Sequence, residues 1–209
     1  MNDLSLLETR VLGTLVEKQH TVPDTYPLTL NALVSGCNQK TSRSPVMEAG
    51  ETEVQATLDG LKRRNLVIES SGGRVARYAH NVDSVLKIPS QSVAILTVLM
   101  LRGPQTPGEL RINCERLHRF ADISALEAFL QELAARPAGA LVVQLARLPG
   151  ARENRWAHLL SGTPTADAIA REGDARDDSV GKNALEARVA RLEAEVAELR
   201  VALDKLRLQ

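Results

Sequence analysis

The heptapeptide RVARYAH at residues 74–80 recurs in altered form as RENRWAH at residues 152–158. Both copies read Arg-x-x-Arg-aromatic-Ala-His, and each follows a turn-forming stretch, SGG at 71–73 and PG at 149–150. Alternation of arginine with an aromatic residue is typical of a β-strand, because successive side chains of a strand point to opposite faces. Two copies at matching places in the predicted order of elements indicate an internal duplication.

The residues before the first copy predict three helices and a strand. Ser5 and Glu8 form a capping-box pair that marks a helix start, and Val54, Leu58 and Leu61 have the spacing of one helix face. The first expected helix opens at Ser5 and is broken by residues 21–24, and the second has Pro27 in its first turn and ends at Gly36. A third helix is expected over residues 51–64, followed by strands over residues 66–70 and 74–80.

The same order of elements is predicted before the second copy. Thr106 is a helix cap and Pro107 occupies the first helical position, so a helix opens there. The other expected elements are helices over residues 92–101 and 123–135 and strands over residues 141–148 and 152–160.

Three helices followed by a β-hairpin is the order of a winged helix-turn-helix. We therefore expect a mainly α fold with small β-hairpins (α+β), made of two tandem winged-helix domains and a C-terminal coiled-coil helix. The expected boundaries are residues 1–85 and 86–162 for the two domains, 163–182 for a flexible linker, and 183–209 for the coiled coil.

The C-terminal helix carries an apolar residue at alternating spacings of four and three, which is the a/d seam of a coiled coil. Valine at two of the three a positions and leucine at every d position favours a parallel dimer, and we expect a homodimer. The alternative is that this short helix folds back onto its own chain. The seam residues are Leu185, Val189, Leu192, Val196, Leu199, Leu203 and Leu206.

Composition places the chain among ordinary globular proteins, with 44% hydrophobic, 25% charged and only 2% aromatic residues in 209. No stretch has the length and apolarity of a membrane span, and the first eight residues lack a secretory signal. Cys37 and Cys114 lie far apart in the sequence, and we expect them to be reduced rather than a metal or redox pair. These features predict a cytoplasmic protein that makes no contact with a membrane.

No arrangement of residues typical of an enzyme is found. The sequence has no phosphate-binding glycine loop, no nucleophile elbow and no cluster with metal-ligand spacing. Its four histidines, His20, His80, His118 and His158, are scattered, and we expect structural roles for the two that end the heptapeptide copies. We therefore expect no enzymatic activity and no cofactor.

Charge gives mixed evidence on nucleic-acid binding. The formal net charge is zero, and the third helix of each unit exposes carboxylates such as Glu51 and Glu127, which phosphates would repel. The cations lie instead in the loop after the second helix and on the hairpins. The candidate nucleic-acid-binding residues are Lys40, Arg43, Arg74, Arg77, Arg152 and Arg155. The alternative for each is that its side chain is simply solvated or ion-paired at the protein surface.

Several stretches of the sequence are similar to a known family. They are YPL (26–28), CNQK (37–40), Arg43, PVM (45–47), residues 102–111, and RENRWAHL (152–159). On these stretches the chain resembles the YceH-like family of uncharacterised bacterial proteins over about residues 4–162. The resemblance implies a tandem winged-helix fold, but it supplies no activity, ligand or site residue.

Two functions remain open from the sequence. A DNA-associated regulatory protein, dimerised by the coiled coil, follows from the fold by analogy. A protein–protein interaction scaffold that does not bind DNA follows from the acidic third helices and the neutral charge. Convergence of Lys40, Arg43, Arg77 and Arg155 on one surface would favour DNA, whereas their burial or pairing would remove that support.

Overall fold

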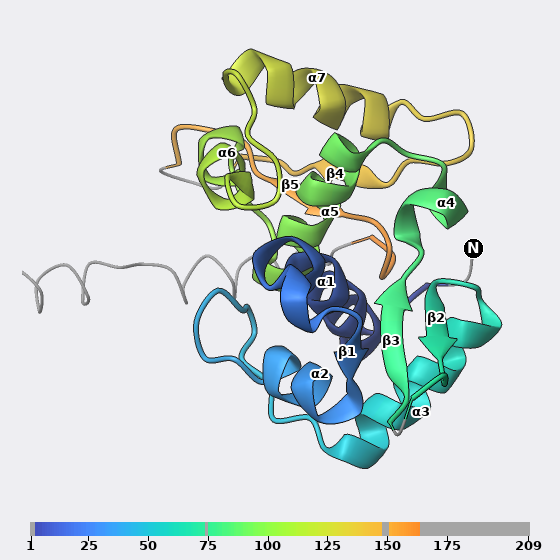
Figure 1. Cartoon of the computed structure of the whole chain (residues 1–209). Coiled ribbons are helices and arrows are strands. Elements are labelled where there is room, and N and C mark those ends of the chain that lie inside the picture. The colour runs from blue at the N-terminus through green and yellow to red at the C-terminus, as the bar shows by residue number, and fades with distance from the viewer. Residues whose placement is uncertain (1–2, 74, 148–150, 164–209) are drawn as a thin grey trace, which may run out of the picture. The chain divides into compact units, whose positions relative to one another are not determined.

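A computed structural model describes residues 3–73, 75–147 and 151–163 (Figure 1). Helices predominate and two small antiparallel sheets accompany them, which confirms the expected α+β class. The elements are α1 (Leu6–Thr21), η1 (Pro23–Thr25), β1 (Leu28–Thr29), α2 (Leu30–Cys37), α3 (Glu51–Arg63), β2 (Val67–Ser70), β3 (Arg77–His80), α4 (Val82–Leu86), α5 (Ser90–Arg102), α6 (Pro107–Cys114), α7 (Ile123–Ala134), β4 (Val142–Gln144) and β5 (Trp156–His158).

The chain repeats one order of elements, and we call α1 through β3 the first half and α5 through β5 the second half. Helices α2 and α6 each have eight residues and each end in a buried cysteine, Cys37 and Cys114. Each begins after a threonine whose hydroxyl accepts a backbone N–H bond, Thr29 or Thr106. The two cysteines are thus equivalent positions of the duplication rather than a pair.

The sheets repeat as well. In the first half the strand order is β1-β3-β2, and Leu28 lies opposite Tyr78. In the second half β4 pairs with β5, and Gln105 forms an isolated bridge to Trp156 at the place that β1 occupies in the first half. The aromatic residue of each heptapeptide copy is buried, so it lies inward as the period-2 pattern requires.

Most helix starts agree with the sequence, although α5 begins at Ser90 rather than at residue 92 and the short α4 was not expected. At α1 the backbone N–H of Ser5 donates to the Glu8 carboxylate at 2.7 Å, and the Glu8 N–H donates to Ser5 Oγ at 3.1 Å. The prediction that Pro27 opens the second helix is wrong, because α2 begins only at Leu30. Residues 27–29 are extended, since Leu28 and Thr29 pair with β3 and the Thr29 hydroxyl caps the helix.

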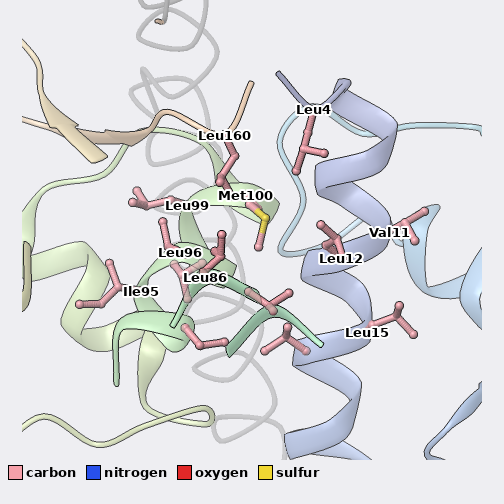
Figure 2. Close-up of a cluster of buried hydrophobic side chains, with 14 of the residues drawn as sticks. Leu4, Val11, Leu12, Leu15, Leu86, Ile95, Leu96, Leu99, Met100 and Leu160 are labelled. Atoms are coloured by element: carbon pink, nitrogen blue, oxygen red, sulfur yellow. The ribbon is translucent and has the colours of Figure 1, made fainter. Parts of the chain in front are cut away.

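Helices α1 and α5 lie side by side and join the two halves in one hydrophobic core (Figures 1 and 2). Every residue from Thr9 to Val16 in α1 and from Ser92 to Leu101 in α5 is buried. Figure 2 shows Leu12 of α1 on the side that faces Met100 of α5, while Val11 and Leu15 project from the opposite side of α1. Burial all around a helix is expected only for an element at the centre of a core.

A glycine permits the close approach of these two helices. A Cβ atom added at Gly13 would lie 2.9 Å from two side-chain carbons of Leu101. Real Cβ atoms do not approach this closely, so α5 could not pack against α1 in the same position if residue 13 had a side chain.

Hydrogen bonds outside the helices also connect the halves. The Leu4 N–H donates to the Leu160 carbonyl at 2.7 Å, and the Ser44 N–H donates to the Leu101 carbonyl at 2.8 Å. Contacts group Met1–Pro164 as one compact unit, and the boundary predicted between residues 85 and 86 falls within α4. The coiled-coil seam from Leu185 to Leu206 lies outside the described residues, as does the expected linker from residue 164 onward.

Candidate functional site

Arg43, a candidate for nucleic-acid contact, is buried inside the first half. Its guanidinium contacts both oxygens of the Glu17 carboxylate, at 3.1 and 2.6 Å, and it donates to the Gly36 carbonyl and to Gln39 Oε1. The Arg43 side chain has 0% exposure and that of Glu17 has 19%. Burial opposes ionisation of Glu17, but the bonds and charge of Arg43 outweigh it and hold the carboxyl pKa below its usual value.

A second arginine is buried beside this pair. Arg10 on α1 donates to the carbonyls of Cys37 and Pro45, at 3.1 and 2.6 Å, and its Nε has no partner among the described residues. Desolvation and the nearby charge of Arg43 both lower the pKa of Arg10. The two arginines therefore fasten the loop of residues 38–50 to α1 and α2, and neither guanidinium is presented to a partner.

The heptapeptide arginines Arg77 and Arg155 bind the backbone of their own half. Arg77 Nη1 donates to the Pro27 carbonyl at 2.7 Å and to the Thr25 carbonyl at 3.2 Å. Arg155 Nη1 donates to the Pro104 carbonyl at 3.1 Å. The prolines are equivalent, since each lies two residues before a helix-capping threonine. Each arginine thus joins the hairpin to the turn that precedes the second helix.

The remaining candidates are dispersed. Lys40 is exposed in loop 38–50 of the first half, and Arg152 is exposed near β5 of the second half. Arg74 lies outside the described residues. Of the four residues expected to converge, only Lys40 therefore offers a side chain without a bond to the rest of the described chain.

The exposed faces of the third helices carry little positive charge. On α7 the exposed residues are Ile123, Ser124, Glu127, Ala128, Gln131 and Glu132, of which none is basic. On α3, Lys62 forms ion pairs with Asp59 and with Glu69, at 2.8 and 2.5 Å. A helix that reads base edges ordinarily exposes several Arg, Lys, Asn or Gln side chains. Of these types α7 exposes only Gln131, and the exposed base of α3, Arg63, lies in its last turn, so neither helix has the face that such a role requires.

A groove lies beside α7, between this helix, the start of α6 and the hairpin of the second half. Its volume is about 400 Å³, and polar side chains from α7 and from both sides of the hairpin line it. The lining residues are Pro107, Gly108, Ile123, Glu127, Gln144, Arg147, Arg152, Glu153 and Asn154. Of these, only Arg152 is among the site candidates predicted from the sequence; the others become apparent only when α7 is compared with α3.

The buried thiols and histidines have structural surroundings. Burial raises the pKa of the Cys37 thiol and raises that of Cys114 to about 12, so both remain protonated near neutral pH. Burial also lowers the pKa of His158 to about 4. No three His, Cys, Asp or Glu side chains in the described parts of the chain are grouped as metal ligands. No described helix has both the length and the apolarity to cross a bilayer.

These features define a duplicated helix–hairpin protein in which the arginines repeated in the two heptapeptides, Arg77 and Arg155, bind their own half. The sequence profile described as "Protein of unknown function, DUF480" matches residues 4–151. The chain belongs to this family, which confirms the membership in a family of uncharacterised bacterial proteins inferred from the sequence.

Curated relatives match nearly the whole chain. A UPF0502 protein of Dechloromonas aromatica is 64% identical over 203 residues, which cover 96% of this chain and 94% of the relative. UPF0502 proteins of Burkholderia vietnamiensis and Paraburkholderia phytofirmans are 58% and 59% identical, covering 99% and 97% of this chain and 89% and 87% of the relatives. Their names state no activity.

Proposed function

We propose that this chain is a non-enzymatic protein-interaction scaffold built from two winged helices. The order helix, strand or bridge, helix, helix and hairpin in both halves supports the winged-helix interpretation. The choice of this function rests on where the candidate arginine side chains lie and what they bind. Arg43 is buried on Glu17, and Arg77 and Arg155 bind carbonyls of their own half.

The shared core supports a scaffold role. Because α1 and α5 pack directly against each other, the two halves present their third helices and hairpins as parts of one body. The third helices expose mostly carboxylates and neutral side chains, with the bases of α3 confined to its last turn, which suits contact with protein better than contact with phosphate. A rigid body with two such surfaces can hold a partner at a fixed position.

A DNA-associated regulatory role is the second candidate, and one observation favours it. Arg111, Arg116 and Arg119 are exposed on α6 and in the segment that leads into α7. This segment precedes the third helix, where winged helices contact the phosphate backbone. It is flanked by Glu115 and Asp122, so its positive charge is partly offset.

Binding to random duplex DNA at low salt, followed by a salt titration, separates the two functions. A scaffold that does not bind DNA should show no salt-dependent affinity for the duplex. Any phosphate contact would release counterions and would therefore weaken as the salt concentration rises. Affinity that falls steeply with salt and is lost in Arg116→Glu/Arg119→Glu would overturn the scaffold proposal. Arg63→Glu, which removes an exposed base from α3, is the matched control for the change in charge.

We also propose that residues 183–209 form a parallel coiled-coil homodimer. The support is the a/d seam together with attractive e/g pairs, in which Arg188 faces Glu193 of the second copy and Glu195 faces Arg200. Deletion of residues 183–209 should convert a dimer into a monomer in light scattering. A truncated protein that remains dimeric would contradict this assignment.

A further inference from the structure

The duplication allows the helix–hairpin surface of one half to be compared with that of the other, position by position. Helices α3 and α7 bury residues at the same spacing, so Gln55 corresponds to Glu127 and Lys62 to Ala134. Glu69 lies opposite the buried Tyr78, as Gln144 lies opposite the buried Trp156. The buried residues that set the helix register are Val54, Leu58 and Leu61 in α3 and Leu126, Leu130 and Leu133 in α7.

In the first half two polar pairs link the third helix to the hairpin. The Tyr78 hydroxyl donates to Gln55 Oε1 at 3.2 Å. Lys62 Nζ lies 2.5 Å from the carboxylate of Glu69 on β2. The side chains of α3 are thus already bonded to the strands beside it.

In the second half all four positions have changed. Glu127, Ala134, Gln144 and Trp156 replace the two pairs, and Ala134 has no polar atom on its side chain. Among the described residues, none of these four side chains forms a hydrogen bond or ion pair. Two of the four, Glu127 and Gln144, line the groove of about 400 Å³, a volume within the usual range for ligand sites, roughly 300–1,000 Å³. Their counterparts in the first half, Gln55 and Glu69, are already bonded to Tyr78 and Lys62.

The lining of the groove has both signs of charge. Arg147 and Arg152 lie on the hairpin side and form no ion pair with the described residues, while Glu127 lies on the helix side. With Glu153 included the lining is neutral, so a phosphate backbone would meet as many carboxylates as cations. The amides of Gln144 and Asn154 can bond peptide N–H and C=O groups, and the 46% exposed Ile123 offers apolar contact.

We propose that this groove binds an extended segment of a partner protein that places an acidic side chain against Arg147 and Arg152 and a basic side chain against Glu127. The inference rests on the proposed scaffold function and names the surface that carries it. The first half, whose corresponding side chains Gln55 and Glu69 are already bonded, does not bind the segment.

A random peptide library displayed on phage and selected on the full-length protein tests this assignment. We expect selected peptides to be enriched in an acidic residue followed or preceded by a basic one. In fluorescence anisotropy, Arg147→Glu/Arg152→Glu should weaken the binding of a selected synthetic peptide about tenfold or more. Replacement of the acidic peptide residue by lysine should restore binding to this variant. Arg63→Glu in the first half should leave the affinity unchanged.

A second variant fills the groove without removing its charges. Gly108 lines the groove, and a Cβ added there would meet only Thr106 Oγ1, at 4.0 Å. We expect Gly108→Phe to lose peptide binding while its urea unfolding midpoint stays near that of the wild type, because the site has room for a side chain and the position is only half-buried. Retention of full affinity in this folded variant would overturn the proposal.

The remaining outcomes separate the groove from the scaffold function. Selected peptides whose affinity is unchanged in both groove variants would overturn the groove assignment and leave the scaffold function standing. Failure to select any peptide overturns the groove assignment. Salt-dependent binding of random duplex DNA that Arg147→Glu/Arg152→Glu abolishes would overturn both, because the groove would then be a nucleic-acid surface.

Discussion

The two halves share one order of elements but differ in what they bury. Arg10 and Arg43 of the first half are buried, and Arg43 lies against Glu17. In the described part of the second half, the buried polar side chains are the neutral Ser92, Thr97 and Gln105. The first half therefore depends on charge–charge contacts in its interior, whereas the second half relies on apolar packing and neutral hydrogen bonds.

The difference extends to the surface. Polar pairs tie α3 to its hairpin, while α7 stands beside an open groove. After a duplication, one copy can retain the contacts that fix the fold while the other exchanges them for groups that face solvent. On this view the first half holds the shared core in place and the second half offers the binding surface.

Removal of the Glu17 carboxylate should produce the largest loss of stability. Glu17→Ala leaves the Arg43 guanidinium buried without its counter-charge, and breaking a buried ion pair costs about 3–5 kcal/mol. Urea unfolding followed by circular dichroism measures the change in the free energy of unfolding. Glu69→Gln, which breaks the exposed pair with Lys62, is the control and should cost less than about 1 kcal/mol. Equal losses in the two variants would show that the first half does not depend on its interior charges.

Acid should lower the stability of the second half through one histidine, His158. His158 Nδ1 is buried without a hydrogen-bond partner in the described chain, and burial lowers the pKa of His158 to about 4. The folded state thus favours the neutral ring. Stability should be complete above the unfolded-state pKa, about 6.5, and should fall as the pH drops from there toward 4, by about 3 kcal/mol in all.

His158→Phe should remove most of this pH dependence, because phenylalanine has no site to protonate. Urea unfolding of the two proteins at pH 7 and pH 4.5 gives the comparison. The equivalent His80 differs, since its Nε2 lies 2.6 Å from Gln19 Oε1, although burial lowers its pKa as well. A slope that persists in His158→Phe would place the acid sensitivity elsewhere in the chain.

A methyl group at the contact between the halves should be the next most costly change. Gly13→Ala places a Cβ 2.9 Å from Leu101, and overpacking of this kind costs about 1–3 kcal/mol. Gly60→Ala in α3 is a matched control, because its nearest neighbour, Glu8 Oε1, would lie at 3.5 Å. There the helix propensity of alanine should stabilise the protein by roughly 0.5–1 kcal/mol. A Gly13→Ala midpoint that does not fall would mean that α5 can move away from α1 without loss.

Local signals in the sequence predicted most of the fold because each acts over a few residues. The capping pairs at Ser5 and Thr106 located two helix starts, and the heptapeptide copies located both hairpins. The start of α2 was misplaced at Pro27 because proline favours the first turn of a helix. Proline is equally compatible with the extended segment that pairs with β3, and that pairing depends on residues about 50 positions away in the sequence.

The roles of the arginines could not be predicted in the same way. Arg43 and Glu17 are 26 residues apart, and no spacing rule connects a loop arginine to a carboxylate on α1. Exposed and buried arginines look alike in a sequence when both stand in polar stretches. The groove was hidden for a related reason, since its lining comes from α6, α7 and the hairpin, which only the three-dimensional structure brings together.

The smallest predicted effect tests the duplication itself. Arg77→Ala and Arg155→Ala each remove a bond to an equivalent carbonyl, at Pro27 and Pro104, and each should lower the free energy of unfolding by about 1–2 kcal/mol. Because the two sites belong to different halves and share no partner, the double variant should lose the sum of the single losses. Urea unfolding of the four proteins supplies the cycle. A double variant that loses clearly more than the sum would show that the hairpins communicate through α1 and α5, and the halves would then be one cooperative element rather than two copies joined at a core.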